Sequence, residues 1–472
     1  MKRKSEFHKD FCGRKTIVAA AATIIALSAC GGGDYENSVS SAQTGEASSV
    51  GTGGGAGGAN VTLLSPVFTS KTSSQFPSNT WSIAALKDES YAFVSLSGAI
   101  IDGVTSSSGA VIAVLKKEAG TWNIVRYIPV NQESKAGTQA LGLTLSRDES
   151  VLFVALGNYG IGLLDVKEAI AGAAKPVYLD LYSGYNKRNS GPGSLAIVES
   201  GDGKHIFIAD EYGEFPGGSG IGDVAVVSYE KNGGGNINAR RLGYIRPEQN
   251  SIAGINVSPD NKVLYILSQL SPKNQYQNFR GLSYPEVAKQ CGASYSGSIS
   301  IVDVGNLLSV AESNPGDGNR ILDNVIQSKV AAGCNPVRVT ASQDGKTVWA
   351  TARGDNKVNA FDAELLRSDP DRAYLYSFES NGAAPVGIAS FAGDRFLAVT
   401  NSNRFAAVDK EGNPLKPNIS IFDVGTRGAP KLLQQIPSGE FPRDIYRRTD
   451  DKSIFVMNWS SGTFQEISVE YR

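Results

Sequence analysis

The sequence contains few of the side chains that most metal and nucleophilic sites use. Its 472 residues include two histidines, four cysteines and two methionines. No cysteines and histidines are grouped at zinc-ligand spacing, and no Gly-x-Ser-x-Gly motif with catalytic partners is apparent. These absences disfavour a zinc enzyme or a serine hydrolase. They leave carboxylates, together with arginine, as the groups available for any chemistry.

An excess of positive charge is also absent. The chain has 45 Lys and Arg against 46 Asp and Glu, a formal net charge of −1. Residues 1–29 hold six basic and two acidic residues, net +4, and subtracting this from −1 leaves −5 for residues 30–472. An acidic chain without a basic tract is a poor candidate for nucleic-acid binding. No long apolar run occurs after residue 29, so we expect no further membrane-spanning segment.

The N-terminus has the layout of an export signal. Six basic residues precede or flank an apolar run from Thr16 to Ala26, which is too short to span a bilayer comfortably. The run ends in Leu27-Ser28-Ala29-Cys30, which resembles the lipobox of bacterial lipoproteins. The resemblance implies that residues 1–29 are a cleaved signal peptide. It also implies that the thiol of Cys30 carries a diacylglycerol with acyl chains such as palmitate.

A tether and a location follow from that resemblance. Residues 30–59 are rich in Gly, Ser, Ala and Thr and cannot bury enough apolar surface to fold, so we expect a flexible tether. Gly31 follows Cys30, where lipoproteins kept at the inner membrane usually have Asp. We therefore expect a protein of the bacterial cell envelope. Its lipid anchor would lie in the outer membrane, with the folded part facing the periplasm or the surface.

After removal of the signal and lipidation of Cys30, two cysteines and one histidine remain. Cys291 and Cys334 form an even pair in an oxidising compartment, and a disulfide between them is expected. This disulfide would pin a polar, aromatic insertion, Ser271–Gly297, as a lid or rim. His205 follows a turn, and we expect it to be exposed to solvent rather than to act as a ligand or base.

A repeated pattern occupies the rest of the chain. A polar turn with Asp, often followed by Gly-Lys, precedes a strand of β-branched and aromatic residues. A further strand, the third of its unit, follows in most copies and ends near Asp-Val, for example at 162–166, 299–304, 358–362 and 419–424. The turn and its strand recur at 86–94, 146–154, 200–208, 258–266, 342–350, 392–399 and 448–456.

Four strands per unit and seven units predict an all-β fold, a seven-bladed β-propeller of four-stranded antiparallel blades, over residues 60–472. The last unit lacks an outer strand, and the segment from Asn60 to Phe68 precedes the first unit without a partner of its own. We expect this N-terminal segment to supply the missing strand and close the ring, which removes two open sheet edges.

These units resemble the YVTN-type repeats of the lactonase-like seven-bladed propeller superfamily. The likeness is strongest over 335–339 and 353–358 and extends over about residues 61–472. The resemblance implies the fold. Some members of the superfamily hydrolyse lactones, but none of their catalytic residues can be matched to a position of this sequence.

Candidate site residues follow from the geometry of a blade. The turn between the first and second strands lies on one face, the bottom, and the variable loops lie on the other face, the top. The top-face loops are rich in Arg, Asn, Asp and aromatic residues, a lining that suits an anionic or glycan ligand. The candidates for ligand binding or catalysis are Asp210, Glu211, Arg338, Arg353, Asn401, Arg404, Arg443, Asn458 and Trp459.

Two functions remain open from the sequence. The first is a monomeric, membrane-anchored binding module that presents its top face to a small anionic ligand, a glycan or an envelope protein. The alternative is a lactonase-type hydrolase that uses carboxylates and arginines of the central funnel. No cofactor is expected, although Asp210, Glu211 and Glu214 are residue types that bind Ca²⁺. We favour the binding module.

Overall fold

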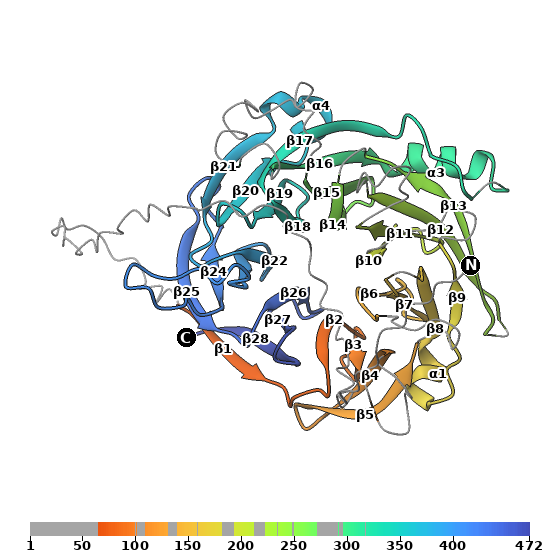
Figure 1. The fold of residues 1–472 in the computed structure, drawn as a ribbon, viewed down its shortest axis with the longest axis horizontal. Coiled ribbons are helices and arrows are strands. Elements are labelled where there is room, and N and C mark those ends of the chain that lie inside the picture. The colour runs from red at the N-terminus through yellow and green to blue at the C-terminus, as the bar shows by residue number, and fades with distance from the viewer. Residues whose placement is uncertain are drawn as a thin grey trace, which may run out of the picture. The chain divides into compact units, whose positions relative to one another are not determined.

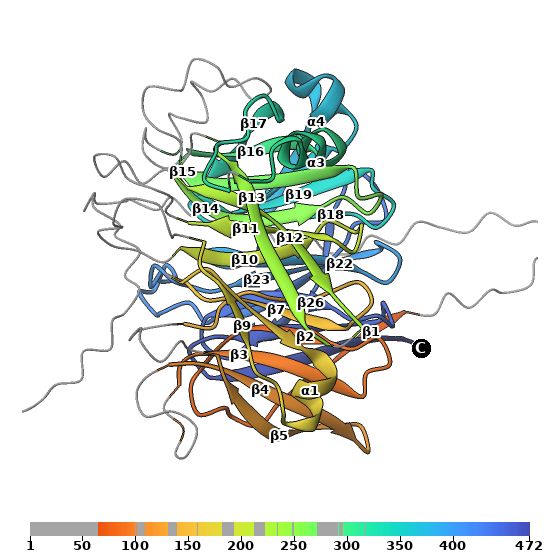
Figure 2. The ribbon, with the colours of Figure 1, turned by 90° about the vertical axis from the view of Figure 1, so that its right-hand side faces the viewer.

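The repeats build the blades that their spacing predicts. The computed structural model describes residues 65–99, 101, 109–130, 139–157, 159–181, 193–211, 222–233, 235–247, 250–270, 291, 296–316 and 318–472. These residues belong to one compact unit, Ser48–Arg472, and form seven four-stranded antiparallel sheets arranged in a ring (Figure 1). Figure 2 shows the same ring from its edge. The predicted seven-bladed propeller is confirmed, whereas the signal, Cys30 and the tether lie outside the described residues.

Each blade runs from an innermost strand at the channel to an outermost strand at the rim. Blades one to three are β2(Asn79–Ala85), β3(Tyr91–Ala99), β4(Gly109–Glu118) and β5(Thr121–Pro129); β6(Leu143–Leu145), β7(Val151–Ala155), β8(Ile161–Asp165) and β9(Val177–Leu179); and β10(Ser194–Glu199), β11(His205–Asp210), β12(Asp223–Lys231) and β13(Ile237–Ile245). Blades four and five are β14(Asn250–Val257), β15(Val263–Leu270), β16(Ser296–Asp303) and β17(Ile326–Cys334); and β18(Pro336–Ala341), β19(Thr347–Ala352), β20(Lys357–Asp362) and β21(Tyr374–Glu379). Blades six and seven are β22(Pro385–Phe391), β23(Phe396–Asn401), β24(Asn418–Asp423) and β25(Lys431–Pro437); and β26(Pro442–Arg447), β27(Ser453–Asn458), β28(Thr463–Tyr471) and β1(Pro66–Thr72).

The N-terminal strand closes the ring. β1 pairs antiparallel with β28, from Pro66 opposite Tyr471 to Thr72 opposite Gln465. Phe68 is buried on this strand, and its ring makes an edge contact with Phe396 of blade six at 5.1 Å between centroids. The expected closure is therefore confirmed. Pairing the two chain ends removes the open edges that would otherwise flank blade seven.

The bottom-face turns share one local structure. In the turn after β14, the carboxylate of Asp260 accepts the hydroxyl hydrogen of Ser258 and the backbone N–H of Lys262. The residue after the aspartate takes a positive φ, as Asn261 does at 59° and Gly345 does at 70°. Asp, Asn and Gly are the residues that tolerate this conformation best. The turn therefore favours these residue types, although Glu89 and Glu149 take the same positive φ in the first two blades.

Short helices connect third to fourth strands on the bottom face, and the sequence pattern did not predict them. They are α1(Val166–Ala171), α3(Val304–Ser313) and α4(Leu365–Ser368), with a 3₁₀ turn at Pro370–Arg372. Asp165 and Asp303, read from the sequence as strand ends, also cap α1 and α3 by accepting backbone N–H groups at 2.8 Å. No helix in the described part of the chain is long and apolar enough to cross a membrane.

Candidate functional site

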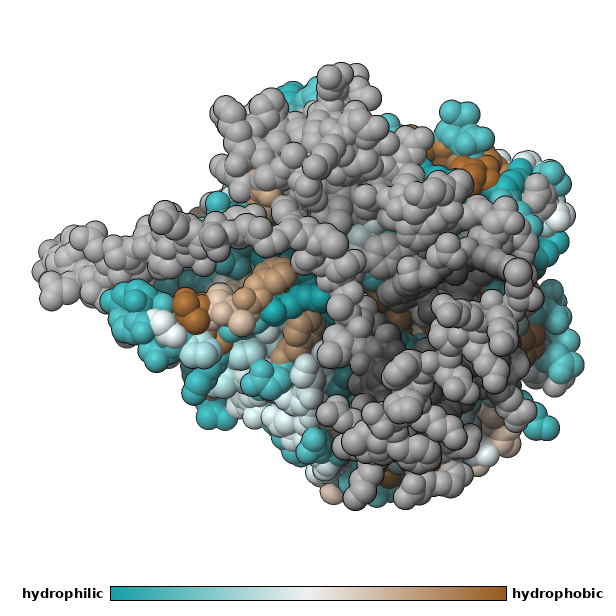
Figure 3. All heavy atoms as spheres, viewed as in Figure 1, coloured by the Kyte–Doolittle hydropathy of each residue, from teal (hydrophilic) through white to brown (hydrophobic). Residues whose placement is uncertain are grey.

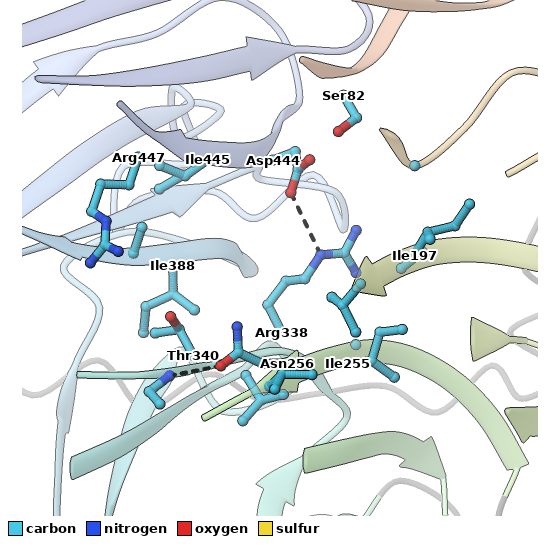
Figure 4. Close-up of a pocket in the computed structure, with 18 of the residues that line it drawn as sticks. Ser82, Ile197, Ile255, Asn256, Arg338, Thr340, Ile388, Asp444, Ile445 and Arg447 are labelled. Carbon is cyan, nitrogen blue, oxygen red and sulfur yellow. Dashed lines mark hydrogen bonds and ion pairs between the residues drawn. The ribbon is translucent and has the colours of Figure 1, made fainter. Parts of the chain in front are cut away.

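The seven innermost strands surround a central channel with a cavity of about 540 Å³. Its wall combines aliphatic and polar side chains, and within it Nε of Arg338 lies 3.9 Å from Oδ1 of Asp444 (Figure 4). Figure 4 shows the surrounding apolar side chains, among them Ile197, Ile255, Ile388 and Ile445.

A bulge near the top of the innermost strands sets the direction of the channel side chains. Pairing of the innermost strand with its neighbour shifts register there in six described blades, including between Pro336 and Val339 and between Pro442 and Asp444. In blade five the hydroxyl of Thr351 fills the gap, because it accepts the N–H of Arg338 and donates to the Val386 carbonyl of the next blade. Bulges commonly re-aim side chains at functional sites. The bulges of blades five and seven lie at Arg338 and Arg443.

Arg338 is held at the upper end of the cavity. Its Nη1 donates to the backbone carbonyl of Ala253 in the neighbouring blade at 2.6 Å. Burial lowers the pKa of Arg338, and the negative charges of Asp444 and Glu211 oppose that shift. The guanidinium is therefore fixed in place and only partly compensated.

Arg443 is the least compensated of the site arginines. Its guanidinium lies over the ring of Trp81 at 3.6 Å, and no carboxylate among the described residues lies within salt-bridge distance of it. Its Nε is buried and has no hydrogen-bond partner in the described part of the chain. Burial lowers the pKa of Arg443 well below its usual value, and repulsion from Arg338 lowers it further.

Arg353 is positioned by two amide oxygens. Following β19, its Nη2 donates to Gln269 at 3.0 Å and to Asn335 at 2.6 Å. The expected disulfide between Cys291 and Cys334 is confirmed, with 5.2 Å between the Cα atoms. The backbone beside this arginine is bonded to one of the disulfide cysteines, because the N–H of Gly354 donates to the Cys334 carbonyl. The disulfide therefore supports the loop that carries Arg353.

Arg404 lies between blades six and seven and completes the group. Its guanidinium lies 5.8 Å from the ring of Phe441, which Arg443 also approaches at 5.9 Å. Phe441 has a positive φ of 52°, a strained conformation for a bulky residue. The equivalent residues before Pro336 and Pro385 are Asn335 and Ala384, also at positive φ. An aromatic ring in this position is therefore kept at a cost that the smaller residues avoid.

Glu211 is the buried carboxylate of this group. It accepts a hydrogen bond from the hydroxyl of Ser251 at 2.9 Å. Burial raises the pKa of Glu211, while the Ser251 bond and the charges of Arg443, Arg353 and Arg404 oppose the increase. Arg338, Arg353, Arg404, Arg443 and Glu211 thus act on one another electrostatically at the top of the channel, and we call these five residues the arginine cluster.

Four other predicted site residues do not belong to the arginine cluster. Asn401 and Asn458 end second strands, but they are buried and bond within their own blades, Asn401 to Asn418 and Ser420 and Asn458 to Thr463. Asp210 is buried at the end of β11. Trp459 packs edge-on against Phe441 at 5.5 Å and supports that ring.

The expectation that His205 is exposed is wrong. His205 is 4% exposed, with Nδ1 at 2.6 Å from Asp202 and Nε2 at 3.1 Å from Glu312 of α3. The unpredicted helix α3 supplies that second carboxylate, which explains why the turn position alone was misleading. His205 lies on the bottom face, away from the arginine cluster.

Sequence reasoning also missed the aromatic supports Trp81, Phe405 and Phe441. Trp81 lies in an innermost strand, where its period-two pattern is that of a core residue. Phe441 precedes Pro442 and Arg443, and a bulky residue before that proline was the available signal. Within the described residues, no group of three or more His, Cys, Asp or Glu side chains could hold a metal ion. Glu214, considered for Ca²⁺, lies outside the described residues.

Comparison with known proteins supports the fold alone. No protein-family model matches the chain, and no curated protein matches it. A similar solved structure is the β-propeller domain of Cps50 (Swd1) from Myceliophteria thermophila, with a TM-score of 0.51, 10% identity, and coverage of 84% of this chain and 99% of that one. A protein of unknown function from Desulfotomaculum acetoxidans aligns with a TM-score of 0.48 and 12% identity, covering 81% of this chain and 90% of its own.

Proposed function

We propose that this chain is a lipid-anchored envelope protein whose propeller binds an anionic ligand at the arginine cluster. The observation that carries the proposal is Arg443, a buried cation without a carboxylate partner among the described residues and with further arginines acting on it. Burying a charge that is only partly compensated, here by the nearby Glu211, is costly, and an incoming anion would reduce that cost. The lipobox-like sequence and the tether support the envelope location.

The ligand chemistry follows from the donors. Guanidinium groups pair bidentately with carboxylate or phosphate, and charge-assisted hydrogen bonds of this kind contribute about 1.5–3 kcal/mol each. Arg338 and Arg353 are already oriented by protein oxygens at 2.6 Å. They lose little side-chain entropy on binding, which favours affinity.

Calorimetric titration tests the proposal. The chain from Gly31 onward, which contains the whole compact unit, would be titrated with citrate and with inorganic phosphate. We expect saturable binding that weakens as salt is added, and a loss of about 10- to 100-fold in affinity for Arg443→Met. Arg372→Met is the matched control, because Arg372 is exposed in the bottom-face 3₁₀ turn. Equal affinities of wild type and Arg443→Met would refute an anion site here.

A second function, hydrolysis of a lactone, is favoured by one observation. Glu211 is a buried carboxyl with a raised pKa beside arginines, the arrangement of a general acid or base next to an oxyanion-stabilising cation. A pH-stat assay on a lactone panel tests it with Glu211→Gln, Arg353→Ala and Asp210→Asn. Turnover that disappears in the first two variants would establish the enzyme. Folded protein without turnover would leave anion binding as the function.

A further inference from the structure

The top-face segment 402–417, between β23 and β24, exposes apolar side chains. Six large hydrophobic side chains are exposed among the described residues, and three of them lie in this segment. Phe405 is 54% exposed, more than any of the other five. Burying an apolar ring is worth about 1.5–3 kcal/mol, so its exposure in a well-packed fold needs a reason.

The exposure is not caused by a lack of local structure. The side chain of Asn403 donates to the Leu415 carbonyl at 2.6 Å and accepts the Ala407 N–H at 2.8 Å. The carboxylate of Asp409 accepts the N–H groups of Glu411 and Asn413. The segment is therefore folded by its own hydrogen bonds, and it holds Phe405 outward in a defined position.

Phe405 adjoins the arginine cluster. The guanidinium of Arg353 lies 5.5 Å from the centre of its ring, and Arg353 is itself fixed by Gln269 and Asn335. Arg404 immediately precedes Phe405 in the chain. Figure 3 shows hydrophobic atoms beside strongly hydrophilic ones over blade six on this face. A ligand that pairs with Arg353 therefore has an apolar ring within reach.

We infer that the ligand of the arginine cluster carries an apolar ring or chain next to its anionic group, and that this part packs on Phe405. The inference rests on the proposed anion site and specifies its ligand. A small amphiphile fits better than a protein partner, because a stable protein interface needs about 800 Å² on each side and a few side chains offer only a fraction of that. Hydrocarbon and the flat face of a sugar ring share this chemistry.

Four carboxylates that differ in the group attached to the carboxylate test the anionic part and the apolar part of the ligand separately. Acetate, hexanoate, benzoate and glucuronate would be titrated into the chain from Gly31 onward. We expect hexanoate or benzoate, or glucuronate if the source is a sugar, to bind at least tenfold more tightly than acetate. Phe405→Ser should reduce that preference to less than threefold and change acetate affinity by less than twofold. Phe405→Trp should restore the preference, and Val125→Ser, which removes an exposed side chain of β5, should leave it unchanged.

The outcomes distinguish this inference from the function on which it rests. Acetate binding without any preference for the larger carboxylates would overturn the apolar subsite and keep the anion site. A preference that survives Phe405→Ser would overturn the assignment to Phe405. If none of the four carboxylates binds, the proposed anion site itself is refuted.

Discussion

Arg443 and Arg448 are five residues apart at the two ends of the same innermost strand, and both are buried, at 9% and 5% exposure. Arg448, on the bottom face, forms ion pairs with Glu89 of blade one and Glu466 of β28. Arg443, near the top, stacks on Trp81 and repels Arg338. Carboxylates of the protein thus pair with the charge of Arg448, whereas no described carboxylate lies within salt-bridge distance of Arg443, whose charge a bound anion would balance.

The contrast extends to the two faces. Bottom-face side chains satisfy one another across blades, as when the carboxylate of Glu149 accepts the N–H of Lys87 and that of Asp394 accepts the N–H of Asp344. Near the top, the arginine cluster places four arginines around the single buried carboxylate of Glu211. The repeated face builds the fold, while the face that breaks the repeat holds the site. Fold and function are thus separable by mutation.

The largest expected effect is the loss of stability on replacing Arg448. Arg448→Met should lower the free energy of unfolding by about 3–5 kcal/mol, because it removes the cation that pairs with the half-buried carboxylate of Glu466. It also removes one of the two cations that pair with Glu89, which keeps Lys117. Arg443→Met should change it by less than about 1 kcal/mol or raise it, because Met also packs on Trp81. Urea denaturation of both variants measures the difference. A larger loss for Arg443→Met would contradict the contrast.

Loss of the disulfide should come next in size. Replacing both Cys291 and Cys334 with Ser opens a link across a sequence separation of 43, and such links contribute about 2–4 kcal/mol. Because the link also supports the loop of Arg353, anion affinity should fall as well. Thermal unfolding and calorimetry would be compared with and without reductant on wild type. Unchanged affinity would mean that the loop keeps Arg353 in place unaided.

Asp355 should make stability depend on pH. Burial raises its pKa to about 7, and its Oδ1 is buried without a hydrogen-bond partner among the described residues. A raised carboxyl pKa means that stability is present below about pH 4, where folded and unfolded forms are both protonated, and is lost as pH rises through 7. Asp355→Asn should therefore be neutral at pH 4 and stabilise by about 1–2 kcal/mol at pH 8, a value reduced for partial exposure to water.

The control for this pH dependence is Asp371→Asn, an exposed aspartate of the bottom-face 3₁₀ turn. Its free energy of unfolding should follow that of wild type at both pH values. An equal gain for Asp355→Asn at pH 4 and pH 8 would show that removal of charge is not the cause.

The smallest expected effect is the change in citrate affinity on replacing Glu211. Glu211→Gln removes a negative charge that acts on four arginines, so citrate should bind about fivefold more tightly, roughly 1 kcal/mol at an effective dielectric constant near 20. Gln can still accept the Ser251 hydrogen bond, which limits any change in stability. Calorimetry measures the gain in affinity. Weaker citrate binding by Glu211→Gln would instead mean that Glu211 donates its proton to a hydrogen bond with citrate.

The sequence predicted what repeats and missed what is particular to one blade. Turn residues such as Asp260 and Asn261 act within a few residues of each other, and the unpaired N-terminal segment and two remaining cysteines each had one plausible partner. His205 was misplaced because its environment depends on a helix more than 90 residues away. Asn401 was assigned to the site from its strand end, but its side chain donates hydrogen bonds within the blade, to Asn418 and Ser420. Trp81, Phe405 and Phe441 gain their roles from arginines of other strands, which no local pattern indicates.

The most direct test is citrate titration of wild type, Arg443→Met and Arg448→Met under one set of conditions, with circular dichroism to show that each is folded. We expect Arg443→Met to lose at least tenfold in affinity and to keep its stability. We expect Arg448→Met to lose stability and to keep its affinity to within about twofold. If both variants lost affinity in proportion to stability, or neither lost affinity, the arginine cluster would not be an anion site.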